Sequence, residues 1–266
     1  MLSRITMIFG AAFVAASFPV AVFANDGTRG LQAGGAIAVT PKFEGSKDYE
    51  IRGFPIVAPA GSGGAPDAGP VQFRGVDDIR FRVVNFLGLE MGPLAGYRFG
   101  RDENDADRLI GLGDVDGGLV VGAYAAFNFG AFKPFVSYHH QVTGDDSGGL
   151  VRFGAETRMP LAMGIALTVV AGASYATEEY NDAYFTVTDA QALTSVAHLA
   201  AYDAEAGIKD VYLSLGTDIP LSDVWSLKLG GRYARLLGDA ADSPIVETEN
   251  QFSGVVGLTY KFSVPR

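Results

Sequence analysis

The stretch Gly100–Phe132 reads GRDENDADRLIGLGDVDGGLVVGAYAAFNFGAF, and its two halves differ sharply in composition. Its first half is rich in aspartate and glycine, whereas two kinds of side chain alternate from Leu119 onward. The odd-numbered positions are apolar: Leu119, Val121, Ala123, Ala125, Phe127 and Phe129. The even-numbered positions are mostly small or polar: Val120, Gly122, Tyr124, Ala126 and Asn128. A period of two predicts a β-strand rather than a helix. A long strand between an acidic loop and a two-residue turn is typical of a membrane β-barrel.

The first 24 residues have the features of a secretory signal peptide. Arg4 supplies a positive start, an apolar tract begins at Ile5, and Val22 and Ala24 place small side chains before a cleavage site. The apolar tract is interrupted by Pro19 and is too short for a transmembrane helix. We therefore expect residues 1–24 to be a signal peptide and residues 25–266 to form one outer-membrane β-barrel domain.

Composition excludes several classes of protein. The chain of 266 residues contains no cysteine, which argues against a small secreted scaffold held by disulfides. It carries 20 basic and 30 acidic residues, for a net charge of −10, and this acidic balance argues against nucleic acid as a partner. After the signal peptide, no apolar stretch approaches the roughly 20 residues that a membrane-spanning helix needs.

The alternation found after Leu119 recurs along the whole chain. It predicts strands at 30–41, 49–59, 69–76, 78–86, 88–99, 117–129, 132–142, 149–159, 163–176, 205–219, 223–237 and 249–262. These are about twelve strands, and bacterial outer-membrane barrels have an even number of strands in this range. The expected fold is all-β: a transmembrane antiparallel up-and-down β-barrel with short periplasmic turns and long extracellular loops.

A soluble β-barrel or sandwich alternates as regularly, but two features favour the membrane barrel. Charged side chains share a face with glycines, as a crowded interior requires, and apolar side chains occupy the other face. The connections between strands are also short at one end of the barrel and long at the other, as in outer-membrane barrels. Short ones fall at 130–131, 160–162 and 220–222, and long ones at 100–116, 143–148, 177–204 and 238–248. Two connections break this rule, 60–68 on the short side and Asp77 on the long side.

The alternation also predicts a charged interior. Basic residues expected to point inward are Arg74, Arg80, Arg82, Arg98, Arg152, Arg158, Lys228, Arg232 and Lys261, with Glu90 and Glu156 among them. Because unpaired charges are costly in so narrow a space, further acids must balance them. We expect the acidic loops to supply these, through Asp102, Asp114, Asp145 or Asp239 folding inward, and so to close the lumen.

Two further predictions concern the side chain of Trp225 and the long loop at 177–204. Trp225 begins its strand beside a turn, so we expect it outside the barrel at the periplasmic membrane boundary. The Ala-rich tract from Asp189 to Ala201 predicts a short helix with Asp189 as its N-cap, folded over the extracellular mouth.

Motifs along the whole mature chain resemble those of the MipA/OmpV family of outer-membrane proteins. They are Phe43-Glu44-Gly45-Ser46, Gly100-Arg101-Asp102-Glu103, Gly111-Leu112-Gly113-Asp114, Val142-Thr143-Gly144, 204–209, 237–246 and 256–262. The resemblance implies an outer-membrane barrel that contacts membrane lipids and lipopolysaccharide. It also implies a scaffold that joins a murein lytic transglycosylase to a peptidoglycan synthase, although other members are described as porin-like or as adhesive surface antigens. Family chains tend to stop at the last aromatic residue, whereas residues 263–266 follow Phe262 here.

Residue types used in catalysis occur near the outer end of the strand predicted at 132–142. His139 and His140 lie there, Asp145 and Asp146 follow in the loop, and Ser137 or Ser147 offers a hydroxyl nucleophile. Polar residues also belong at strand ends without any catalytic role. The sequence contains three histidines and no nucleophile-elbow motif, so we predict no enzyme and no catalytic residue.

The acidic loops also raise the question of a metal site. Asp102, Glu103, Asp105, Asp107, Asp114 and Asp116 offer the oxygen ligands that Ca²⁺ prefers. The sequence lacks the spacing of an EF-hand loop, and aspartate is common in solvated turns. We predict no metal and no cofactor.

Two functions remain open from the sequence. The first is a non-enzymatic outer-membrane scaffold for peptidoglycan-remodelling enzymes, as the resemblance implies. The alternative is a narrow porin-like diffusion channel or a surface adhesin. For the scaffold, partner sites belong on the periplasmic turns, of which 60–68 is the longest.

Overall fold

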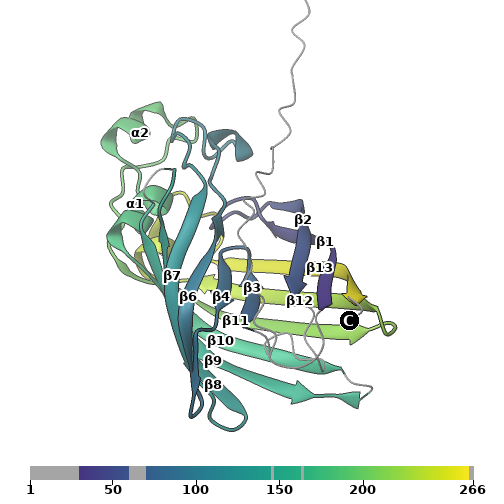
Figure 1. The fold of residues 1–266 in the computed structure, drawn as a ribbon. Helices are drawn as coiled ribbons and strands as arrows, with labels where there is room; N and C mark the ends of the chain where they lie inside the picture. The colour runs from purple at the N-terminus through teal and green to yellow at the C-terminus, as the bar shows by residue number, and fades with distance from the viewer. Residues whose placement is uncertain (1–29, 60–69, 145–146, 163–164, 264–266) are drawn as a thin grey trace, which may run out of the picture.

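The computed structural model describes residues 30–59, 70–144, 147–162 and 165–263. The predicted signal peptide, the connection 60–68 and Asp145 lie outside the described residues. Thirteen strands form one antiparallel sheet (Figure 1). They are β1 (Gly30–Pro41), β2 (Tyr49–Pro59), β3 (Val71–Gly75), β4 (Asp78–Phe81), β5 (Val84–Phe86), β6 (Leu89–Arg98), β7 (Gly118–Phe127), β8 (Phe132–Gln141), β9 (Gly149–Pro160), β10 (Ala166–Ala176), β11 (Gly207–Pro220), β12 (Trp225–Leu236) and β13 (Asn250–Ser263).

The sheet curls into a near barrel because its first and last strands meet. β1 pairs with β13 in an antiparallel ladder that places Ile37 opposite Val256. The strand order is β2-β1-β13-β12-β11-β10-β9-β8-β7-β6-β4-β3, with β5 also paired to β6. Among the described residues, no ladder joins β2 to β3. The predicted all-β antiparallel barrel is therefore confirmed.

Each of the twelve predicted segments contains a strand, and 78–86 contains two. The break falls at Arg82 and Val83, where the register against β6 shifts by one residue. Arg82 donates to the carbonyl of Pro70 at 2.7 Å, whereas Val83 donates to that of Met91 at 3.0 Å. Arg80 pairs with Leu94 of β6 but Val84 pairs with Met91, so the two ladders differ in register by one residue and β4 and β5 pair separately with β6.

The two faces of the strands follow the predicted alternation. In β7, Leu119 is 54% exposed on the outer face, whereas Val120 and Tyr124 are buried on the inner face. Trp225 also lies outside, 40% exposed, with its ring edge-on to Tyr260 at 5.0 Å between centroids. Apolar outside and polar inside is the arrangement that lipid requires of a barrel.

The long loops fold into a cap at one end of the barrel (Figure 1). It contains α1 (Glu178–Phe185), α2 (Asp189–Thr194), α3 (Gly238–Asp242) and the 3-10 helix η1 (Glu103–Asp105). No helix within the described residues is both long and apolar enough to cross a membrane. Two apolar clusters stabilise the cap and its join to the strand ends. The first comprises Val115, Leu150, Ala176, Tyr180, Tyr184, Phe185, Ala204, Leu236 and Ala240. The second comprises Phe43, Leu109, Leu112, Val187, Leu199 and Ile245.

The helix predicted at 189–201 is present but shorter, and its cap differs. The N-cap is Thr188, whose hydroxyl accepts from the backbone N–H of Gln191 at 3.2 Å, rather than Asp189. The helix ends at Thr194 because the next residues bond to another loop: the N–H of Val196 donates to the carbonyl of Ile110 at 3.1 Å.

Candidate functional site: the charged barrel interior

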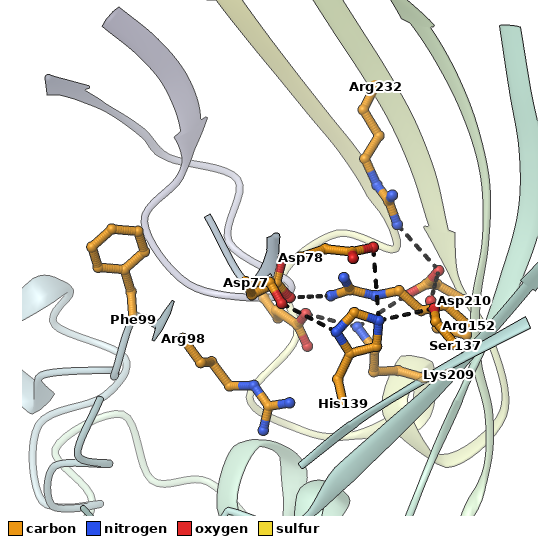
Figure 2. A network of polar contacts seen from close by, with 12 residues as sticks. Asp77, Asp78, Arg98, Phe99, Ser137, His139, Arg152, Lys209, Asp210 and Arg232 are labelled. Carbon is orange, nitrogen blue, oxygen red and sulfur yellow. Dashed lines mark hydrogen bonds and ion pairs between the residues drawn. The ribbon is translucent and has the colours of Figure 1, made fainter. Parts of the chain in front are cut away.

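The turn between β3 and β4 lies inside the barrel. Its residue Asp77 crosses close to Gly96 of β6, where an added Cβ would come within 2.5 Å of the Asp77 backbone. The Asp77 carboxylate accepts from Nη2 of Arg152 on β9 at 2.5 Å, and its backbone carbonyl lies 3.1 Å from Nδ1 of His139 on β8. Figure 2 shows this turn held by side chains from the facing strands. The shortest connection on the extracellular side is thus part of the interior.

The next residue, Asp78, forms a two-pronged ion pair with Arg80. Nε and Nη2 of Arg80 each lie 2.8 Å from a different oxygen of Asp78. Both side chains are almost fully buried, and the Arg80 guanidinium lies 4.9 Å from the ring centroid of Tyr124. Residues two apart on one strand share a face, and the fork geometry satisfies both carboxylate oxygens.

The facing wall contributes a second buried group of charges, centred on Asp210 of β11. Its carboxylate lies 2.9 Å from Nζ of Lys209, and it accepts from the Ser174 hydroxyl at 2.9 Å. Lys209 also donates to Glu44, in the β1–β2 loop, at 2.7 Å. A β-bulge pairs Ser174 with Asp210 and the next residue with Ile208, so Lys209 is the extra residue of β11. The bulge explains why two consecutive charged side chains are both buried.

Smaller pairs continue the network toward the periplasmic end. Lys133 lies 2.8 Å from Glu90, Lys228 lies 2.6 Å from Asp218, and Arg74 pairs with Glu156. Most residues predicted to point inward form a charged or polar contact in the interior. The basic ones pair with an acid or a backbone carbonyl, and they are Arg74, Arg80, Arg82, Arg98, Arg152, Lys228 and Arg232; Glu90 and Glu156 are two of the acids. The charged interior was therefore predicted correctly on these strands.

The predicted source of the balancing acids was wrong for Asp102, Asp114 and Asp239, whereas Asp145 lies outside the described residues. Asp102, Asp114 and Asp239 stay in the cap, where each accepts a backbone N–H at 2.8 Å, from Asn104, Glu103 and Glu205 respectively. Short carboxylates in irregular loops satisfy local backbone donors in this way. The acids that balance the interior cations come from the β3–β4 turn, β4, β11 and the β1–β2 loop: Asp77, Asp78, Asp210, Asp218 and Glu44.

The cap is attached to this network through Tyr180 of α1. Its ring lies 4.9 Å from the Arg98 guanidinium and 5.5 Å from Nζ of Lys209. Burial raises the pKa of the Tyr180 hydroxyl, with the nearby Glu44 carboxylate adding to the effect, so the ring stays neutral. The cationic head groups thus meet the negative face of an uncharged ring.

A cavity of about 140 Å³ lies among the interior side chains. Its charged lining comprises the cations Arg74, Arg80, Lys133, Arg152 and Arg232 and the acids Asp78 and Glu156. Phe135, Val170, Tyr212 and Ser214 complete it.

The structure brings together only some of the candidate catalytic residues near the end of β8. Nε2 of His139 lies 2.9 Å from the Ser137 hydroxyl, but both side chains are buried and the other imidazole nitrogen contacts Asp77. His140 lies on the opposite face of β8, beside the Tyr138 hydroxyl at 3.3 Å. Ser147 is buried and donates to Gln141, and Asp145 and Asp146 lie outside the described residues. The Ser137–His139 pair thus contacts the hairpin turn at the Asp77 carbonyl.

The acidic loop residues do not converge on a cation site. Among the residues that the structure describes, no three His, Cys, Asp or Glu side chains are grouped so that they could hold a metal ion. Glu103 instead accepts from the backbone N–H groups of Gly111 and Gly113, at 3.1 and 3.2 Å.

Comparisons with known proteins place the chain in a family. OmpV of Vibrio cholerae is 28% identical over 172 residues, which cover 64% of this chain and 63% of OmpV. Omp26La of Vibrio anguillarum is 28% identical over 190 residues, covering 69% of this chain and 70% of that protein. Both are named as outer-membrane proteins.

Among solved structures, an outer-membrane channel from Pseudomonas putida F1 aligns with 92% of this chain and 99% of its own, at 12% identity and a TM-score of 0.43. So loose a likeness carries no argument about function. Residues 33–262 match the family described as MltA-interacting protein MipA, which covers almost all of the described barrel. The chain therefore belongs to the MipA family and is an outer-membrane β-barrel protein.

Proposed function

We propose that this protein is a non-enzymatic scaffold of the outer membrane that binds peptidoglycan-remodelling enzymes at its periplasmic end. The observation that carries the proposal is the ion-paired interior, joined to a folded cap, which makes the barrel a rigid body. The family description, MltA-interacting protein, supports a lytic transglycosylase as one partner. A peptidoglycan synthase is the proposed second partner.

The periplasmic turns are the surface that such partners reach. Leu87 lies in the turn between β5 and β6, is 80% exposed and has a φ of 50°. A left-handed conformation is unfavourable for leucine and suits asparagine or glycine better. An exposed leucine kept in a strained turn is therefore a reasonable contact residue for a partner protein.

A pull-down tests the proposal. The refolded barrel is immobilised in detergent and exposed to a purified MltA-type lytic transglycosylase, with a peptidoglycan synthase in a parallel experiment. Leu87→Asn should weaken capture of the enzyme without destabilising the barrel. Leu193→Asn is the matched control, because Leu193 is 89% exposed on α2 at the opposite end. Absence of capture by the parent protein would contradict the proposal.

A narrow diffusion channel is the second candidate function, and the interior cavity is the observation that favours it. It differs from the scaffold in requiring a continuous aqueous path through the barrel. Ion conductance therefore separates the two.

A further inference from the structure

The interior cavity has an uneven distribution of charge on its surface. Five cationic side chains line it against two acids. The carboxylates that pair with three of these cations, Asp77 with Arg152, Glu90 with Lys133 and Asp210 with Arg232, are not part of the lining. The lining of the cavity therefore carries more cations than acids, because three of the paired carboxylates lie outside it.

Two arginines in the lining keep donor capacity that the protein does not use fully. The closest carboxylate oxygen to Nη2 of Arg232 belongs to Asp210 at 3.7 Å, which is too long for a hydrogen bond. The Arg232 guanidinium lies 3.8 Å from the ring centroid of Tyr212, and 36% of the side chain is exposed. Nε of Arg152 is buried without an acceptor among the described residues. Arg232 therefore keeps N–H groups for a ligand, and Arg152 lines the same cavity with a guanidinium that its protein partners do not fully satisfy.

We propose that this cavity binds a small oxyanion, with Arg152 and Arg232 as its main donors. The planar fork of arginine matches the paired oxygens of phosphate, sulfate and carboxylate groups. Ser214 and Lys133 add a hydroxyl and an ammonium donor to the same lining. A volume of about 140 Å³ far exceeds the roughly 10–15 Å³ that one water needs, so an oxyanion fits with part of its hydration. The site does not depend on the proposed scaffold role.

Isothermal titration of inorganic phosphate into the refolded full chain, at constant ionic strength, tests the proposal. We expect saturable binding that sulfate displaces and that an equal concentration of chloride does not. Arg232→Gln should weaken phosphate binding at least tenfold. Lys228→Gln is the matched control: Lys228 lies on the same strand, pairs with Asp218 and is absent from the cavity lining, so affinity should be unchanged.

Arg232→Lys provides a second variant that retains the charge and the ion pair with Asp210. It should still bind phosphate more weakly than the parent, because an ammonium cannot present a two-pronged fork. Three results would overturn the proposal: no saturable binding by the parent, equal competition by chloride, or equal losses in the Arg232→Gln and Lys228→Gln proteins. Equal losses would mean that only the total charge of the interior matters.

Discussion

Asp77 and Arg152 form an ion pair across the barrel interior, although 75 positions separate them in the sequence. Asp77 belongs to the turn between β3 and β4, and Arg152 projects from β9 on the facing wall (Figure 2). The pair holds a short hairpin inside a barrel whose other extracellular connections form the cap. It therefore links the edge of the sheet to its centre.

Removing one partner of this pair should destabilise the barrel. Asp77→Asn leaves Arg152 without its carboxylate, and because both side chains keep some exposure we expect a loss of about 2–3 kcal/mol. The free energy of unfolding in urea, measured after refolding into lipid vesicles, gives this value. The double variant Asp77→Asn/Arg152→Gln should recover part of the loss. A double variant as unstable as the sum of the two single variants would show that the pair is not coupled.

A side chain at Gly96 should push the hairpin out of place. An added Cβ would lie 2.5 Å from the Asp77 backbone, so Gly96→Ala should cost about 1–3 kcal/mol, the usual range for overpacking. Gly231→Ala is the control, because an added Cβ there meets nothing nearer than 4.0 Å. The same unfolding measurement checks both, and equal stabilities would mean that the hairpin does not occupy this position.

Acidification should loosen the contact between two cap loops. Burial alone would raise the pKa of Glu247, but the hydrogen bonds and charge of Lys47 outweigh it and lower the pKa below its usual range. Because the pKa of Glu247 is lower in the folded state, the Lys47–Glu247 contact contributes to stability above about pH 4.5. That contribution is lost as pH falls through the folded-state pKa. Nearby, Gly45 accepts from the backbone N–H groups of Glu247 and Thr248.

Hydrogen exchange of the Thr248 amide measures this effect. Its protection should fall as pH drops below about 4.5, after correction for the intrinsic exchange rate, while amides within β12 stay protected. In the Glu247→Gln protein the protection should no longer vary with pH. A parent protein whose protection is constant over this range would refute the assignment.

A charge on the lipid-facing surface should destabilise the barrel strongly. Leu215 on β11 is 46% exposed on the outer face, and Leu215→Arg near mid-membrane should cost about 2–4 kcal/mol. Leu193→Arg on α2 lies in the cap and should cost almost nothing. Refolding into bilayers followed by denaturant unfolding compares the two. Equal midpoints for the Leu215→Arg protein and its parent would mean that this face does not contact lipid.

Most of the barrel wall could be predicted from the sequence because a strand repeats every two residues. The alternation alone placed Arg152 and Glu90 inside and Trp225 outside, and the structure confirms all three. A charge on a strand surrounded by glycines and small residues is a strong local signal, and it needs no knowledge of the partner strand.

The contacts that complete the interior depend on information that the alternation does not contain. The bulge at Lys209 reverses the inside–outside order within one strand, so a strict period of two cannot place both Lys209 and Asp210 inside. Helix α1 was missed because a search for a period of two does not detect a helix; its buried Tyr180 and Tyr184 are four residues apart, as on one helical face. The Asp78–Arg80 ion pair could have been predicted from the sequence, because Asp78 lies two residues before Arg80 and hence on the same face of the strand.

Single-channel conductance in planar lipid bilayers distinguishes a closed, rigid barrel that binds partners from an open pore. The ion-paired interior and the cap predict no large steady currents from the purified, refolded protein, with a general porin measured alongside as a positive control. Asp77→Asn/Gly96→Ala, which should displace the hairpin, is expected to raise the frequency of brief openings. Large, steady single-channel currents from the parent protein would show instead that the interior is an open pore.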